Sequence, residues 1–486
     1  MPVVLALLVL FLLILPVGAL VEEESGVGLL LSSANGGHAA PAAIIGGSDI
    51  SISNLGSGSP AIDISNDGTF VAVAYYKIGR NEGGVHVKSA TAAQGWLTTR
   101  YLGPGQNPSL AFSSNANDRV FVVWVKDENK AIGFADCTLA LSSPPSCTIS
   151  NLVTVASGNL DTPDIVVDST DPQVLHAAWV QDGDIRTARS ANSGVSWQLF
   201  NNIPTSGAAN DFETPQLAAS NNLLHLAFRN KSSVDNLGKS IRYYRAANSA
   251  IHSWANLKNF RLGIEVNGQY NDLANPAIVA SGSNVYLAWD AQTDAAAGDD
   301  DDFGLMRVES KTDGFSWATA SHITQNTNAA TNVQNPLKIS RKSGAGVVPV
   351  QEGALRPSMT ISGSGFALVW QQRGIDGQGC QEDGNASSEI HHAYTDTVWS
   401  EDVLADDETQ YSIDPDLAVD SGGISHFAFM KDPDADNQDP GCIGGEANEY
   451  GIYYRGPFTL TLNDKGEDPA DPDTQPTIYL PIIMKS

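Results

Sequence analysis

Four aspartates lie close together near the carboxyl-terminal end of the chain, at Asp432, Asp434, Asp436 and Asp439. Their spacing places several hard oxygen ligands in one short turn, as calcium-binding loops do. The segment departs from the EF-hand pattern, because Asn437 stands where the turn glycine belongs and no glutamate occupies the twelfth position. The pattern predicts a calcium site, and a solvated acidic loop is the alternative.

Four cysteines could form two disulfide bonds, which fits export into an oxidising compartment. Cys137 and Cys147 flank a short Pro-containing segment and are expected to close a hairpin. Cys380 and Cys442 each precede by ten residues an isoleucine that begins a predicted strand, so they hold equivalent places in neighbouring segments. We expect the second bond between these two, and free buried thiols are the alternative.

The elements that must position these residues belong to a repeat that begins with a proline. The seven prolines are Pro60, Pro108, Pro163, Pro215, Pro276, Pro357 and Pro415. A large apolar residue stands two positions after each proline, and an aromatic residue ends an apolar run further on. The seven aromatic residues are Tyr75, Trp124, Trp179, Phe228, Trp289, Trp370 and Phe429. Because one such unit cannot bury its own apolar faces, the repeat predicts a closed array of seven units.

Within each unit the hydrophobic period is two, which predicts short antiparallel strands separated by Gly, Asn, Asp and Pro. A fourth strand is expected after the tryptophans that end several units. Four strands in each of seven units predict an all-β, seven-bladed β-propeller that spans residues 45–463.

Two segments could provide the last strand that closes the ring. Residues 50–55 resemble 148–152, the expected outer strand of the second unit, and could pair with the last blade. Residues 458–462 are the alternative. Pairing of the two ends would remove exposed sheet edges, which otherwise promote aggregation.

The long insertions of the chain follow the second strands of blades five, six and seven. In a propeller these connections lie on the same face as the connections between blades. Because long loops on a rigid scaffold commonly carry binding residues, this sector of one face is the predicted site.

Two segments resemble the Asp-box, or BNR repeat, of sialidase-like propellers, with the pattern Ser-x-Asp-x-Gly-x-Thr-Trp. They are residues 190–197 and 310–317, in which Asn192 and Thr312 replace the aspartate. The resemblance implies a propeller in which these turns join the outer strands, on the face opposite a sialidase active site. The motif therefore implies a role in folding, without catalysis.

A sialidase-like activity would further require an arginine triad, a tyrosine nucleophile with a glutamate partner, and an acid/base aspartate. The Arg-Ile-Pro motif is absent, and Arg356 before Pro357 is a partial match only. Arg373, Glu389 and Tyr453 are the candidate catalytic residues on the elaborated face. A ring of this size offers many such trios, so these three are weak candidates.

The ends of the chain have their own composition. Residues 1–20 are apolar and predict a signal peptide, with an uncleaved anchor as the alternative. Residues 21–44 predict a flexible lead, and residues 464–486 a Pro/Asp-rich linker with an apolar tail. The tail resembles short YLP-type endings on exported proteins of some filamentous bacteria. The chain is therefore expected to be secreted or displayed at the cell surface.

The formal net charge of −28 argues against nucleic acid and anionic membranes as partners. The leading hypothesis is an exported, non-catalytic and monomeric recognition propeller that binds a glycan or a protein through blades five to seven. A diverged Asp-box glycoside hydrolase and a structural surface protein are the alternatives. Nothing in the sequence identifies the ligand.

Overall fold

The part of the chain that the structure describes consists of strands and turns, as expected for an all-β protein. This computed structural model describes residues 50–53, 57–78, 83–92, 94–126, 128–156, 158–200, 203, 211–231, 240–248, 254–260, 273–292, 303–318, 321–322, 338–340, 347–349, 354–362, 365–373, 388–395, 403–404, 411–432 and 450–456. These ranges contain no α-helix, so no helix in them could cross a membrane. The predicted signal peptide, lead, linker and tail lie outside them.

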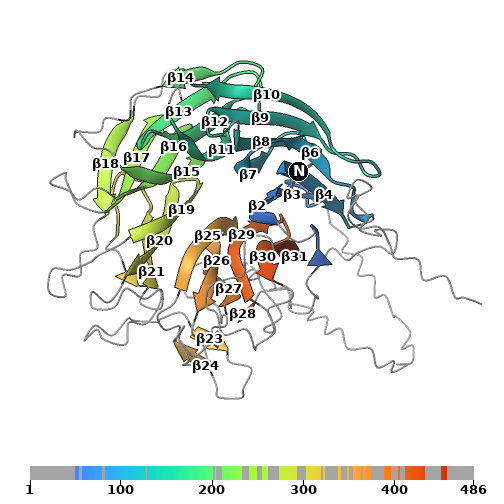
Figure 1. The fold of residues 1–486 in the computed structure, drawn as a ribbon. Coiled ribbons are helices and arrows are strands. Elements are labelled where there is room, and N and C mark those ends of the chain that lie inside the picture. The colour runs from blue at the N-terminus through green and yellow to red at the C-terminus, as the bar shows by residue number, and fades with distance from the viewer. Residues whose placement is uncertain are drawn as a thin grey trace, which may run out of the picture. The chain divides into compact units, whose positions relative to one another are not determined.

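Seven antiparallel sheets form the blades of a ring, with the first strand of each blade innermost (Figure 1). The first strands are β2 (Ser57–Ile64), β7 (Gln106–Phe112), β11 (Leu160–Val167), β15 (Phe212–Ser220), β19 (Leu273–Ser281), β25 (Ala354–Ser362) and β29 (Tyr411–Val419). The second strands are β3 (Phe70–Lys77), β8 (Arg119–Lys126), β12 (Leu175–Gln181), β16 (Leu223–Asn230), β20 (Asn284–Gln292), β26 (Gly365–Arg373) and β30 (Ser425–Asp432). The predicted seven-bladed β-propeller is confirmed.

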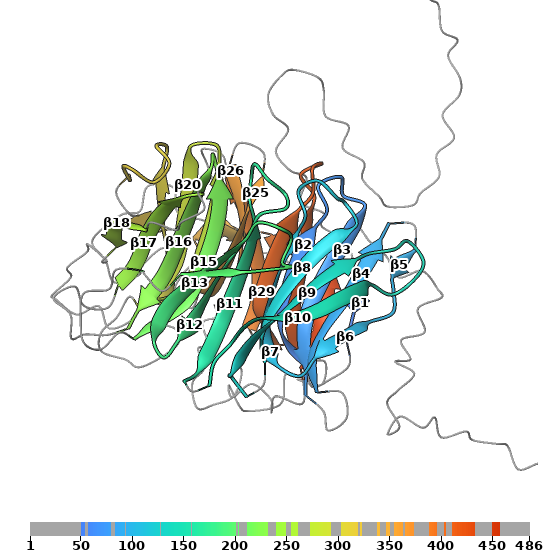
Figure 2. The same cartoon turned by 90° about the horizontal axis from the view of Figure 1, so that it is seen from above.

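The outer half of each blade follows the same order. The third strands are β4 (Gly84–Thr91), β9 (Ala131–Thr138), β13 (Asp184–Ser190), β17 (Ser240–Ala247), β21 (Phe303–Ser310), β27 (Ser388–Thr395) and β31 (Gly451–Arg455). The outer strands are β5 (Gly95–Trp96) with β6 (Arg100–Gly103), β10 (Ser146–Thr154), β14 (Gln198–Phe200), β18 (Ala255–Phe260), β22 (Ser321–His322), β28 (Val403–Leu404) and β1 (Ile50–Ser51). A separate hairpin, β23 (Lys338–Ser340) and β24 (Val347–Pro349), follows blade five. Figure 2 shows the same blades after a turn of 90° about the horizontal axis.

The first of the two predicted closures is confirmed. Strand β1 pairs with β31, so a segment from before blade one becomes the outer strand of blade seven. The amide of Ile52 also donates a hydrogen bond of 2.8 Å to the Ile452 carbonyl. The alternative segment, residues 458–462, lies outside the described residues.

A β-bulge explains why each repeat contains both a proline and a distant aromatic residue. In every inner strand the residue before the proline has a φ of 40–52°, in the left-handed region. These residues are Ser59, Asn107, Thr162, Thr214, Asn275, Arg356 and Asp414. In every blade, this residue and its proline lie opposite a single position of the second strand, and that position holds the buried aromatic residue. The two parts of the sequence repeat are therefore the two sides of one bulge.

Neighbouring blades are joined by aromatic contacts near their outer strands. Trp317 of blade five packs edge-on against Tyr243 of blade four, with ring centroids 4.8 Å apart. Trp197 and Phe134 form the equivalent contact between blades three and two, at 5.3 Å. Such pairs contribute roughly 0.5–1.5 kcal/mol each beyond the area they bury.

The two segments that resemble Asp-boxes connect third and fourth strands, where the resemblance places them. In the first, the Asn192 side-chain oxygen accepts a hydrogen bond of 2.9 Å from the Ser196 amide. In the second, the Thr312 hydroxyl accepts the equivalent bond from the Ser316 amide, also at 2.9 Å. The side chains of Asn192 and Thr312 thus each supply an acceptor at the position where the family pattern has an aspartate.

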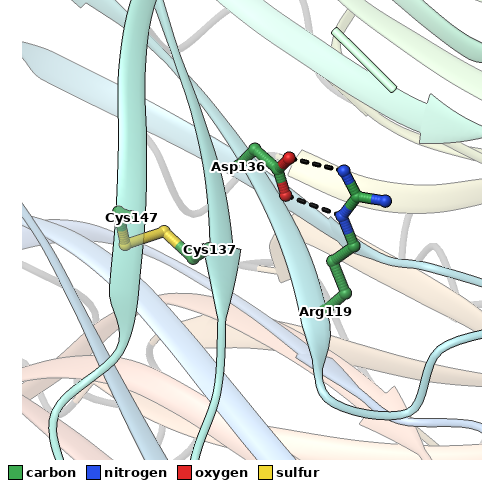
Figure 3. The surroundings of a disulfide bond; sticks show 4 residues. All are labelled: Arg119, Asp136, Cys137 and Cys147. Carbon is green, nitrogen blue, oxygen red and sulfur yellow. Dashed lines mark hydrogen bonds and ion pairs between the residues drawn. A yellow bond between two sulfur atoms is a disulfide. The ribbon is translucent and has the colours of Figure 1, made fainter. Parts of the chain in front are cut away.

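The predicted disulfide of blade two is present. Cys137 in β9 is bonded to Cys147 in β10, and the two residues lie opposite each other in the sheet (Figure 3). On the neighbouring strand β8, Arg119 forms a two-bonded ion pair with Asp136, with 2.7 Å between Arg119 Nε and Asp136 Oδ1. The disulfide bond between β9 and β10 therefore closes the predicted hairpin. Cys380 and Cys442 lie outside the described residues, so their bond remains a prediction.

Candidate functional site

A cavity of about 710 Å³ lies at the centre of the ring, and residues of all seven inner strands line it. Its wall includes every left-handed residue that precedes a repeat proline. We call the side of the ring at which the inner strands begin the proline face. Because strands alternate in direction within a blade, the connections between second and third strands lie on this face too. The bulges and the elaborated connections therefore share one side of the propeller.

The wall of this cavity contains carboxylates that connect neighbouring blades. Asp164 of blade three accepts a hydrogen bond of 2.8 Å from the Ser109 hydroxyl of blade two. Its other oxygen accepts a bond of 2.7 Å from the Leu217 amide of blade four. Burial raises the pKa of Asp164 to about 6, and the nearby charge of Asp416 adds to the shift.

Two further carboxylates of the wall repeat this arrangement. Asp416 of blade seven accepts bonds from the Ser358 hydroxyl of blade six and from the Ile62 amide of blade one. Asp63 of blade one accepts a bond of 2.8 Å from the Phe112 amide of blade two, and burial raises its pKa to about 6. Since Asp63, Asp164 and Asp416 all bind groups of adjacent blades, their first role is to hold the ring together.

A group of polar residues from blades five, six and seven forms one sector of the cavity rim. We call Asn275, Asp290, Arg356 and Asp414 the rim cluster. Asn275, Arg356 and Asp414 are left-handed bulge residues that line the cavity. Arg356 forms an ion pair with Asp414 of the next blade, and 43% of the Arg356 side chain remains exposed. The cluster therefore presents a guanidinium, an amide and a carboxylate at the mouth of the cavity.

Asp290 lies behind this rim, at the end of β20, and is fully buried. One of its oxygens accepts a bond of 2.8 Å from the Asn275 side-chain amide and a bond of 3.0 Å from the Arg356 backbone amide. Burial raises the pKa of Asp290, and this shift is opposed by the two hydrogen bonds and by the charges of Arg356 and Arg229. Asp290 thus connects blades five and six beneath the exposed rim side chains.

Blade four continues the charged surface beside the rim cluster. The Glu213 carboxylate accepts a bond of 2.7 Å from Arg229 and one of 3.2 Å from Lys231. Glu213 directly precedes a left-handed bulge residue, and Arg229 directly follows the repeat aromatic, so both lie at the proline face. Glu213 thus joins two basic side chains at the proline face of blade four.

The long connections predicted to carry the site begin where expected, after β20, β26 and β30. Most of their residues lie outside the described ranges. The backbone of Arg373 ends β26, and Glu389 pairs with Gln372 on the adjacent strand, so both stand at the proline face of blade six. Tyr453 lies in β31, where its ring stacks on Phe429 with centroids 6.4 Å apart. The catalytic roles of Arg373, Glu389 and Tyr453 remain predictions.

The predicted calcium ligands lie at the start of the blade-seven connection. Asp432 is the last residue of β30, whereas Asp434, Asp436 and Asp439 lie outside the described residues. Among the residues that the structure describes, no group of three or more His, Cys, Asp or Glu side chains is arranged to hold a metal ion. We keep calcium binding at these four aspartates as a proposal.

If the proposal holds, calcium at ten times its dissociation constant should raise the free energy of unfolding by roughly 1.4 kcal/mol. Thermal melting with calcium and with a chelator measures this shift. Replacing Asp434 and Asp436 by asparagine should remove it, whereas the same change at Asp300 and Asp301 of blade five should not. Identical melting curves of the wild-type protein in calcium and in chelator would exclude the site.

Comparison with known proteins supports the fold. No model of a known family matches the chain, and no curated protein sequence matches it. An ulvan lyase of polysaccharide lyase family PL25, solved bound to -[GlcA(1-4)Rha3S]-, has 9% sequence identity and a TM-score of 0.50. The match covers 84% of this chain and 95% of that one. This similarity shows that the ulvan lyase and this chain share a fold.

Two further solved structures are similar over most of their length. The polysaccharide lyase Uly1 has 9% identity and a TM-score of 0.50, covering 82% of this chain and 90% of that chain. The BP39L lectin from Burkholderia pseudomallei has 13% identity and a TM-score of 0.43, covering 78% and 96%. The two lyases place this chain among propellers of the same architecture.

The sequence interpretation missed most of the rim cluster. The sequence predictions do not include Asn275, Asp290 or Asp414, and they name Arg356 only as a partial motif match. A usable pattern was present, because three of the four cluster residues directly precede a repeat proline. The side chain at that position varies from serine to arginine, so residue type alone does not mark it.

Proposed function

We propose that this protein is an exported, non-catalytic recognition propeller that binds a glycan on the proline face, beside blades five to seven. The observation that carries this proposal is the rim cluster, in which Arg356, Asn275 and Asp414 present side chains of three chemical types at the mouth of a central cavity. Guanidinium, amide and carboxylate groups together pair with the donors and acceptors of sugar hydroxyls.

The hydrogen bonds of the cavity wall support recognition over catalysis. Hydrolysis of a glycoside commonly uses two carboxyl groups that can reach the scissile bond. Asp164 and Asp416 instead accept hydrogen bonds from the two adjacent blades, and Asp290 is buried behind the rim. The polysaccharide lyases that share the fold make a glycan the first ligand class to test.

A glycan array and a panel of chromogenic glycosides test the proposal with the purified protein. We expect binding to at least one glycan and no turnover. Replacing Arg356 by alanine should weaken that binding about tenfold or more, because a charge-assisted hydrogen bond is lost. Arg186 of blade three is the matched control, since it also forms an ion pair with an aspartate, Asp184, at the proline face.

Each result has a clear meaning. Turnover of a glycoside would favour the diverged hydrolase and contradict the proposal. Absence of glycan binding would contradict it as well and would leave a protein ligand or a structural role. Equal losses in the Arg356→Ala and Arg186→Ala variants would place the ligand elsewhere.

A further inference from the structure

Asp290 has an unusual environment for a charged residue. Its side chain is fully buried, one oxygen accepts two hydrogen bonds, and the other oxygen is buried without a hydrogen-bond partner. Buried polar atoms are nearly always paired, so this position needs an explanation. Both partners of Asp290, Asn275 and Arg356, are residues that line the cavity.

The hydrogen bond from the Arg356 amide to Asp290 holds the backbone of the blade-six bulge. Arg356 has a φ of 51°, and its amide points out of the regular ladder and requires another acceptor. The equivalent amide in blade one, that of Ser59, donates to the sulfur of Met430 at 3.4 Å. A carboxyl oxygen is a much stronger acceptor than a thioether. The bulge of blade six is therefore held more firmly than that of blade one.

We infer that Asp290 is a positioning residue for ligand recognition, which fixes the Arg356 backbone and the Asn275 side chain so that both face the cavity mouth. The inference rests on the proposed function. Asp290 itself does not touch the ligand, because the rim covers it. Preorganised side chains bind more tightly, since less conformational freedom is lost on binding.

Comparison with Asp164 separates positioning from simple stabilisation. Asp164 also connects neighbouring blades through two hydrogen bonds, but its partners are the Ser109 hydroxyl and the Leu217 amide. Both lie in blades two and four, away from the rim cluster. Loss of Asp164 should therefore weaken the ring and leave the rim cluster unchanged.

The test compares Asp290→Ala, Asp290→Asn and Asp164→Ala, using the glycan that binds best on the array. Asp290→Ala leaves the Arg356 amide and the Asn275 side chain without their acceptor, and we expect about tenfold weaker binding. Asparagine keeps one oxygen for both bonds, so Asp290→Asn should bind within about twofold of the wild-type protein. Asp164→Ala should lower the melting temperature without changing the hydrogen exchange of peptides that contain Arg356.

Hydrogen exchange of peptides that contain Arg356 gives a second readout that needs no ligand. Exchange should be faster in Asp290→Ala and close to wild-type in Asp290→Asn. Affinities that follow melting temperature across all three variants, or unchanged exchange in Asp290→Ala, would overturn the inference. If the wild-type protein binds no glycan, the proposed function fails, and the exchange measurement still decides whether Asp290 fixes the bulge.

Discussion

Replacing Gly314 by alanine should destabilise the protein by about 3 kcal/mol or more, because no room exists for a side chain there. Gly314 lies in the second Asp-box-like turn with a φ of 74°, and a Cβ atom would stand 1.8 Å from the Tyr243 hydroxyl oxygen. A left-handed φ adds about 1–2 kcal/mol of strain for any residue with a Cβ. Chemical denaturation measures the change in the free energy of unfolding.

Tyr243 cannot easily move away from this clash. Its side chain is fully buried in blade four, and its hydroxyl is 2.7 Å from His225 Nδ1. Burial lowers the pKa of His225 to about 4 and raises that of Tyr243, so near neutral pH an uncharged imidazole meets a protonated phenol. Displacing Tyr243 would break this buried bond.

Gly282 provides the matched control. It also has a left-handed φ, of 52°, but a Cβ atom there would meet nothing within 4 Å. Gly282→Ala should therefore show the backbone strain alone, about 1 kcal/mol. Similar losses at the two glycines would mean that the contact between blades four and five contributes little.

The repeat made the fold predictable because its proline and its aromatic residue lie next to each other in the folded blade. A proline and an aromatic residue 13 positions apart, such as Pro276 and Trp289, lie on the two sides of one bulge. The bulge depends on local sequence and recurs in each of the seven blades, so the sequence shows it seven times. Strand alternation and blade number follow directly from this pattern.

The candidate site was less predictable because its contacts join different blades. Asp290 and the Arg356 amide are separated by 66 positions, and only the packing of blade six against blade five brings them together. Both residues adjoin positions of the repeat, Pro357 and Trp289, but the repeat does not indicate which side chains make contact between blades. The Asp-box-like turns show the reverse case, since Asn192 and Thr312 depart from the pattern and still supply the required acceptor. Local hydrogen bonding tolerates these substitutions, whereas a site between blades depends on the complete fold.

The seam at which the ring closes should be sensitive to Ile52→Ala, because Ile52 directly follows β1 and its amide bonds to the Ile452 carbonyl. Ile52 is 3% exposed and packs in a core with Trp96 of blade one and Tyr454 of blade seven. Its carbonyl also accepts a bond of 3.2 Å from the buried Lys88 ammonium group. Truncation of a buried isoleucine leaves a cavity, and we expect a loss of about 3 kcal/mol in the free energy of unfolding.

Measuring which strands exchange faster distinguishes a residue that closes the ring from one that only stabilises the core of a blade. Strand β1 pairs directly with β31 of the last blade, so Ile52→Ala should speed hydrogen exchange in β31 more than in β12 or β16. Ser51→Ala is the control, because Ser51, the last residue of β1, directly precedes Ile52 but is exposed, and its loss should change stability by less than about 0.5 kcal/mol. Uniformly faster exchange in all blades would mean that the ring opens as one cooperative unit. Unchanged exchange in β31 would contradict the role of β1 as the strand that closes the propeller.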